Sequence, residues 1–172
     1  MCRNDLFAMR KALVKGLNIS PSNIHLCGET GIVTKNDFIA SIYTVLKDIS
    51  GNDTFIFYFS GHGGKNCLVL SDGLIELQDL LNAIEQVQAK TKIAIIDSCH
   101  SGGFSLENVP AIDIDETVEH FAGRGFAVLA SCGADQYSGF NEDNEISLYT
   151  SFVCDALTAR FLIREGKKSL EA

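Results

Sequence analysis

Two apolar segments of this chain each lead into a turn that carries a reactive side chain. Residues 54–60 run into a glycine-rich turn with His62, and residues 92–96 run into a turn with Cys99. A cysteine attacks as a thiolate, and an imidazole is the side chain best suited to activate it near neutral pH. A packed structural thiol is the ordinary interpretation of one isolated cysteine. The pair of turns instead predicts a cysteine nucleophile with its histidine.

The elements that position these turns alternate between helix and strand. Parallel strands end at a common edge, and α/β proteins place their sites beyond the carboxyl ends of such strands. The pattern predicts the α/β class, as a three-layer sandwich with a mostly parallel central sheet. We expect strands at 24–27, 54–60, 92–97 and 125–131, and a hairpin over 67–75. We expect helices at 5–17, 77–88 and 147–162, and a further helix that begins after an N-cap at Thr34. Residues 104–119 are expected to be an irregular acidic stretch.

Composition limits the functions that the chain can have. It has 172 residues, 46% of them hydrophobic, which suits a single domain, 1–172. The net charge of −8 argues against nucleic acid and favours basic peptides as partners. Six scattered cysteines form neither a disulfide framework nor a zinc motif, so we expect reduced thiols in a cytoplasmic protein. No apolar run is long enough to predict a membrane span.

Five short motifs together resemble those of the caspase-like cysteine peptidases, most closely the metacaspase and orthocaspase branch. The histidine and cysteine motifs are SGHG at 60–63 and DSCHSG at 97–102, and their key residues stand 37 positions apart. The other three are CRND at 2–5, SCGADQ at 131–136 and YTSF at 149–152. The nucleophile motif of animal caspases, Gln-Ala-Cys-x-Gly, is absent, which disfavours an aspartate-cleaving caspase.

The resemblance also predicts that the domain is incomplete at both ends. Family members usually begin with a core strand just before the Asn-Asp helix, and this chain starts at that helix. Residues 167–172 look like the opening of a further helix. We therefore expect the first strand and the C-terminal end of the domain to be missing.

The resemblance implies catalytic roles for three residues. Cys99 would attack the peptide carbonyl, and His62 would move protons, including the one delivered to the leaving amine. The backbone N–H groups of Gly63 and Cys99 would hold the oxyanion, since glycine lets a substrate carbonyl approach the main chain. His100 is the less favoured base, because adjacent residues at a strand end point to opposite sides.

Three aspartates predict a preference for Arg or Lys before the scissile bond. Asp97 shares a strand side with Cys99 by alternation, and Asp5 and Asp135 match acidic positions in the related motifs. Each also has a structural interpretation: Asp5 as support for its helix N-terminus, Asp97 as a brace for the turn, and Asp135 as a loop cap.

No cofactor is expected, and calcium activation has weak support. Some metacaspases need calcium through aspartates after the histidine strand, but here residues 65–74 contain only Asp72. Asp113, Asp115, Glu116 and Glu119 are better explained as a solvated stretch, since Ca²⁺ needs about 6–8 converging oxygens.

Two other function classes compete with an active peptidase. One is a catalytically silent caspase-like interaction module. The other is a phosphate-binding α/β domain, which is disfavoured because neither glycine-rich turn contains Gly-Lys-Ser/Thr.

Overall fold

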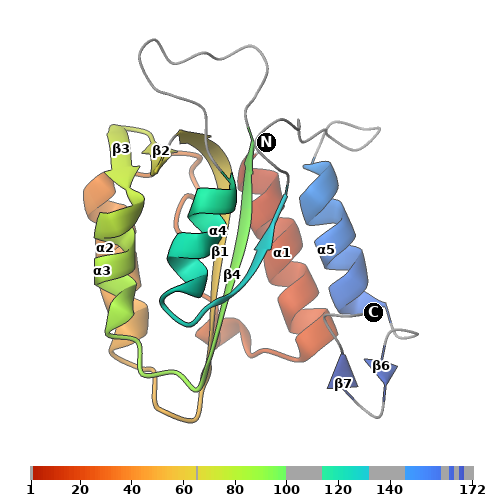
Figure 1. The fold of residues 1–172 in the computed structure, drawn as a ribbon. Coiled ribbons are helices and arrows are strands. Elements are labelled where there is room, and N and C mark those ends of the chain that lie inside the picture. Colours follow the sequence, from red (N-terminus) through yellow and green to blue (C-terminus); the bar gives the residue numbers. More distant parts are fainter. Residues whose placement is uncertain are drawn as a thin grey trace. The chain divides into compact units, whose positions relative to one another are not determined.

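The computed structural model describes residues 2–64, 66–99, 114–131, 146–159, 163–164 and 167–168. The chain divides into two compact units, one of residues 27–138 and the other of residues 1–26 with 139–172. The elements in chain order are α1 (Cys2–Leu17), a 3-10 turn (Pro21–Asn23), α2 (Lys35–Leu46), β1 (Thr54–Gly64), β2 (Cys67–Leu70), β3 (Gly73–Glu76), α3 (Leu77–Glu85), β4 (Thr91–Cys99), α4 (Ile114–Ala122), β5 (Ala127–Ala130), α5 (Leu148–Thr158), β6 (Ile163–Arg164) and β7 (Lys167–Lys168) (Figure 1).

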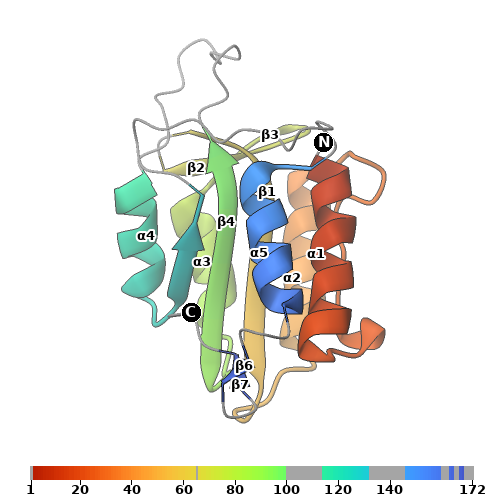
Figure 2. The same ribbon diagram turned by 90° about the vertical axis from the view of Figure 1, so that its right-hand side faces the viewer.

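A five-stranded sheet forms the centre of the unit 27–138. Its order is β3-β2-β1-β4-β5, in which β1, β4 and β5 run parallel while β2 and β3 are antiparallel additions. Figure 2 shows β4 and β5 pointing towards the same edge. The α/β class with a sheet that is parallel at its centre is therefore confirmed. The hairpin expected over 67–75 is confirmed as β2 and β3.

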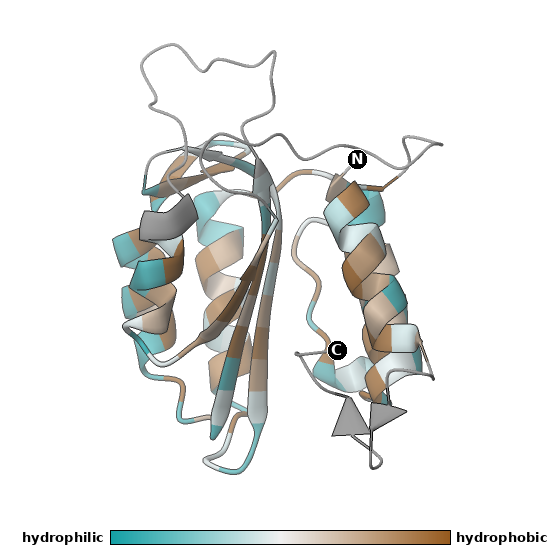
Figure 3. Ribbon diagram, turned by 45° about the vertical axis from the view of Figure 1, so that its right-hand side comes forward, coloured by the Kyte–Doolittle hydropathy of each residue, from teal (hydrophilic) through white to brown (hydrophobic). Residues whose placement is uncertain are grey.

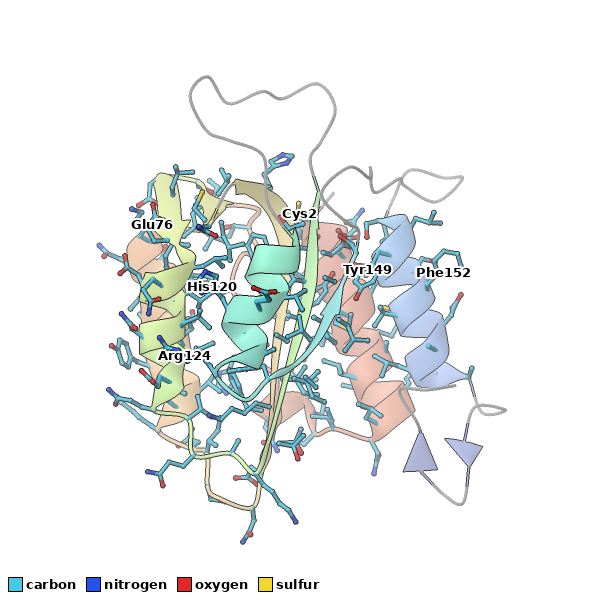
Figure 4. All side chains as sticks on the ribbon, viewed as in Figure 1. Cys2, Glu76, His120, Arg124, Tyr149 and Phe152 are labelled. Carbon is cyan, nitrogen blue, oxygen red and sulfur yellow. The ribbon has the colours of Figure 1, made fainter. Side chains whose placement is uncertain are left out.

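Helices α2, α3 and α4 cover one face of this sheet. Alternate residues of β1 are buried against them, as are Ala94 and Ile96 of β4. Figure 3 shows apolar residues along the strands and on the neighbouring helices. Arg124, which is labelled in Figure 4, follows α4 and forms an ion pair of 2.8 Å with Glu85 of α3. This unit therefore has two layers of the expected sandwich, and the third layer stays a prediction.

Phenylalanine rings fill the space between β1 and its helices. The ring of Phe57 stacks on that of Phe121 of α4, with ring centroids 6.0 Å apart. Phe57 also makes a T-shaped contact with Phe38 of α2, with ring centroids 6.3 Å apart. Phe55 packs edge-on against Phe126, with ring centroids 6.2 Å apart. Such rings each bury about 150–250 Å². The aromatic cluster therefore fixes which face of β1 turns inward.

The predicted cap of α2 is present and is tied to the β2–β3 turn. The Thr34 hydroxyl accepts a hydrogen bond from the Asp37 N–H at 3.1 Å and donates one to the Asp37 carboxylate at 2.7 Å. The Asp72 carboxylate accepts the Lys35 N–H at 2.9 Å. Ser71 pairs with Val33 through two further hydrogen bonds. Two unpaired donors at a helix start are thus satisfied.

Helices α1 and α5 pack together in the other unit. Met9, Ala12 and Leu13 form the buried side of α1. Asp5 is 1% exposed, and its carboxylate accepts the Ser147 N–H at 2.8 Å. The Ser147 hydroxyl in turn accepts the Thr150 N–H and caps α5. A buried carboxylate therefore holds the start of one helix against the other.

Two of the expected strand bounds were too short. β1 and β4 continue through His62 and Cys99, so these residues lie on strand ends and not on turns. The parallel ladder continues to the pair His62↔Cys99, and β1 then joins β2 through Gly63 and Gly64. Glycines at a strand end usually indicate a turn, and here pairing with neighbouring strands overrides that preference.

Three other local expectations were wrong. The segment 24–27 forms no strand; Ile24 and Leu26 are half-buried, and this packing explains their apolar alternation without a ladder. Residues 114–119 belong to α4, because Thr117 and Phe121 supply a buried side that the acidic residues around Thr117 obscure in the sequence. Residues 167–168 pair with 163–164 as a short hairpin instead of opening a helix.

None of the helices among these described residues is both long and apolar enough to cross a membrane.

Gly61 is required by the ring beneath it. A Cβ at this position would lie 2.7 Å from the Phe59 ring, which is itself buried. We expect Gly61→Ala to lower the free energy of unfolding by about 1–3 kcal/mol, because the ring must shift in a packed core. Urea denaturation followed by circular dichroism measures this change.

Gly51→Ala is the matched control, since the nearest atom to its added Cβ is the Gln88 carbonyl oxygen at 3.6 Å. We expect it to stay within about 0.5 kcal/mol of the wild type. Adding Phe59→Leu to Gly61→Ala should recover part of the lost stability. Equal stability of Gly61→Ala and Gly51→Ala would refute the steric argument.

Candidate active site

The histidine and the cysteine occupy paired positions on neighbouring strands. In the parallel ladder of β1 and β4, His62 is the Cα partner of Cys99, and this pair is the last of nine. Neighbouring strands lie about 4.8 Å apart, and paired residues share one face of the sheet. His62 is exposed. The sheet therefore brings the two predicted catalytic residues side by side at its carboxyl edge.

Phe59 and Gly61 set the conformation of the strand that carries His62. The Phe59 ring lies under Gly61, so the backbone passes directly over the ring one residue before the histidine. Phe59 was not among the residues predicted from sequence to matter for the site. A glycine two residues after an aromatic side chain in a buried strand is the signal that was available, because such a glycine often marks close packing.

Asp97 lies at the same edge, two residues before Cys99. It is 3% exposed and pairs in register with Ser60 of β1. Burying a carboxylate is costly unless partners or a cation compensate its charge. Ser98, between Asp97 and Cys99, is fully buried. A buried carboxyl group therefore lies on the strand that ends in the candidate nucleophile.

The third parallel strand, β5, ends at this edge one residue before the motif that contains Asp135 in the sequence. β5 pairs with β4 through Ile96↔Ala130, and the Ser131 N–H then donates to the Ile96 carbonyl at 3.0 Å. The Ser131 hydroxyl donates to the Ser98 carbonyl at 3.4 Å. Residues 132–136, with Asp135, lie outside the described residues, as does His100. The ladder fixes the chain only up to the residue that precedes the motif.

Asp5 has a structural partner in the other unit. Its carboxylate accepts the Ser147 N–H, which supports the structural interpretation of this residue. Its role in substrate binding stays a prediction.

Two other cysteines lie in surroundings that disfavour the thiolate. Burial raises the pKa of the Cys67 thiol, and the Glu76 carboxylate on the paired strand adds to the rise. Burial raises the pKa of Cys154 to about 11, with further contributions from Asp155 and Asp5. A raised pKa leaves little thiolate at neutral pH. Cys67 and Cys154 are therefore poorly suited to act as nucleophiles.

A calcium site receives no support from the residues that the structure describes. In that part of the chain no three His, Cys, Asp or Glu side chains are grouped so that they could hold a metal ion. Asp72 accepts a backbone N–H from α2, and Glu119 is exposed on α4. Asp113 lies outside the described residues, and so do the side chains of Asp115 and Glu116.

Comparison with known proteins identifies relatives for this arrangement. Metacaspase-6 of Arabidopsis thaliana is 30% identical in an alignment that covers 59% of this chain and 33% of the relative. Metacaspase-1 of the same organism is 27% identical, in an alignment that covers 59% of this chain and 34% of the relative. Metacaspase-1 of Scheffersomyces stipitis is 26% identical, in an alignment that covers 59% of this chain and 31% of the relative. The chain thus spans about a third of the length of the curated relatives it matches.

The sequence model of the caspase domain matches residues 1–168, which is nearly the whole chain and includes both strand ends of the candidate site. This chain therefore belongs to the caspase domain family.

Proposed function

We propose that this chain is a cysteine endopeptidase in which Cys99 is the nucleophile and His62 is the proton carrier. The observation that supports this proposal most directly is the register of β1 and β4, which pairs the two residues. Family membership and similarity to metacaspases support the same chemistry. The net charge of −8 suits a peptide substrate that carries basic residues.

The reaction follows from the two groups. The Cys99 thiolate attacks the scissile carbonyl carbon, so that a C–S bond forms and the carbonyl oxygen gains the electron pair. His62 gives its proton to the nitrogen of the leaving amine as the C–N bond breaks. Water, deprotonated by the same imidazole, then attacks the acyl-enzyme and frees the thiol. The N–H groups of Gly63 and Cys99 hold the oxyanion. Gly63 is the first residue of β1 beyond the parallel ladder, which supports its assignment.

Preference for Arg or Lys before the scissile bond rests on Asp97. A buried carboxylate two residues from the nucleophile offers a basic side chain a charge-assisted hydrogen bond. Arg suits this role because its planar fork can meet two carboxylates, and Asp135 is the proposed second one.

A reducing compartment also fits the chain. Cys2, Cys27, Cys67 and Cys154 are free thiols. We infer a cytoplasmic location, where thiols stay reduced.

Replacing either catalytic residue should abolish peptide cleavage without unfolding the protein. His62→Ala and Cys99→Ala should each lower kcat/KM by on the order of 10³-fold or more, because neither the nucleophile nor its proton carrier has a substitute. Hydrolysis of a fluorogenic arginine peptide measures this loss, and thermal melting reports the fold.

Cys2→Ala and His25→Ala are the matched controls, since both residues are exposed. They should retain wild-type activity. Activity near the wild-type level in either catalytic variant would refute the peptidase assignment. A wild-type protein that cleaves no peptide would favour the silent interaction module.

Alkylation should separate the candidate nucleophile from Cys67 and Cys154. We expect iodoacetamide at pH 7.5 to modify Cys99 fastest, and Cys67 and Cys154 slowest, because burial and raised pKa keep those two thiols protonated. Mass spectrometry of tryptic peptides over a time course gives the order. Cys99 among the slow sites would argue against an activated thiol.

The specificity proposal predicts a selective defect in Asp97→Asn. Cleavage after Arg should weaken by about 2–5 kcal/mol in transition-state binding, because the substrate cation loses a buried partner. Exposed Asp48→Asn is the control and should cut like the wild type. Preference for Asp before the scissile bond, or an Asp97→Asn enzyme unchanged toward Arg peptides, would show that the pocket lies elsewhere.

A further inference from the structure

The solvent-facing side of α1 combines cations with apolar side chains. Six positions on this side of the helix lie three or four residues apart or next to one another and include no acid. We call them the basic face: Arg3, Phe7, Arg10, Lys11, Val14 and Lys15. The single acid of α1, Asp5, is 1% exposed and bonded to Ser147. In the described part of the chain no ion pair is formed by Arg10, Lys11 or Lys15.

A shallow depression runs along this face. Its volume is about 270 Å³, and its lining consists of basic and apolar residues: Phe7, Arg10, Lys11, Val14, Lys15 and Pro21. Phe7 is 37% exposed, and the Arg3 guanidinium lies 5.4 Å from the centroid of its ring. Pockets for whole small ligands usually measure about 300–1,000 Å³. This one suits a single apolar side chain surrounded by positive charge.

The charge of α1 is opposite to that of the protein as a whole. The unit 27–138 contains 15 acidic and six basic residues, whereas α1 contains four basic residues and one buried acid. A local cluster of cations in a protein of net charge −8 attracts an acidic segment at short range.

We propose that the basic face of α1 is a docking site for an acidic peptide segment with one apolar anchor residue. The anchor enters the depression beside Phe7 and Val14, while carboxylates on either side meet Arg10, Lys11 and Lys15. Clusters of basic side chains are a recurring means of recognising acidic peptide motifs. The site uses none of the proposed catalytic residues, so it stands or falls independently of peptide cleavage.

An anionic membrane is the weaker candidate for the same face. Membrane attachment needs a broad apolar side together with favourable charge. Here the depression has only three apolar lining residues, Phe7, Val14 and Pro21. The net charge of −8 also repels the protein as a whole from anionic lipid.

Fluorescence anisotropy with a defined peptide tests the proposal. The protein is the full chain with Cys99→Ala, so that no cleavage occurs. The probe is a labelled heptapeptide with one leucine between two runs of three glutamates. We expect saturable binding that weakens as salt rises, and about 3- to 10-fold weaker binding to Lys11→Gln/Lys15→Gln.

The controls separate charge from anchor and peptide from lipid. Lys35→Gln/Lys47→Gln removes the exposed lysines at the start of α2 and directly after its end, and should bind like the parent. A peptide with serine in place of leucine should bind more weakly to the parent, and Phe7→Ala should remove that difference. The proposal is overturned by equal binding of all lysine variants, by no binding at millimolar peptide, or by capture on phosphatidylserine vesicles without peptide binding.

Discussion

The parallel pairing of β1 with β4 is the constraint on which the candidate site depends. Nine consecutive Cα pairs run from Thr54↔Thr91 to His62↔Cys99. Side chains alternate between the two faces of a strand. If β1 slipped by one residue relative to β4, His62 would lie on the other face of the sheet and would no longer be paired with Cys99. Neither residue needs a loop of special conformation to meet the other. The juxtaposition follows from where two strands end.

Hydrophobic packing is what holds this register. Phe55, Phe57 and Phe59 are all at most 8% exposed, and slipping β1 would turn this side away from α2 and α4. Burying each ring contributes about 1.5–3 kcal/mol relative to exposure. The aromatic side thus specifies a register that the ladder hydrogen bonds alone would not. Phe59 contributes twice, because its ring also dictates glycine at position 61.

Local patterns predicted much of this architecture from sequence. Apolar runs identified β1 and β4, the Thr34–Asp37 spacing identified the cap of α2, and the turn after Leu70 identified the hairpin. Each signal lies within a few residues, where side-chain type and backbone conformation are directly coupled. The histidine and cysteine motifs also predicted the pair that the ladder brings together.

Non-local contacts explain what sequence could not predict. The hydrogen bond between Asp5 and Ser147 joins residues 142 positions apart, so nothing near Asp5 signals it. The end of the β1–β4 ladder depends on pairing with β2, which overrides the glycine turn signal at Gly63. The buried side of α4 was hidden by acidic neighbours of Thr117 and Phe121. The alternation of apolar residues over 24–27 comes from side chains that are partly buried, and this segment pairs with none of the described strands.

A crystal structure of the protein bound covalently to an arginine peptide aldehyde tests the central claim most directly. We expect a bond from the inhibitor carbon to Cys99 Sγ, with the His62 imidazole within about 2.6–3.2 Å of the adduct oxygen or linked to it by one water. His62 and Cys99 would remain partners in the β1–β4 ladder. An adduct on another cysteine, or a register in which His62 pairs with a neighbour of Cys99, would show that these two residues are not the catalytic pair.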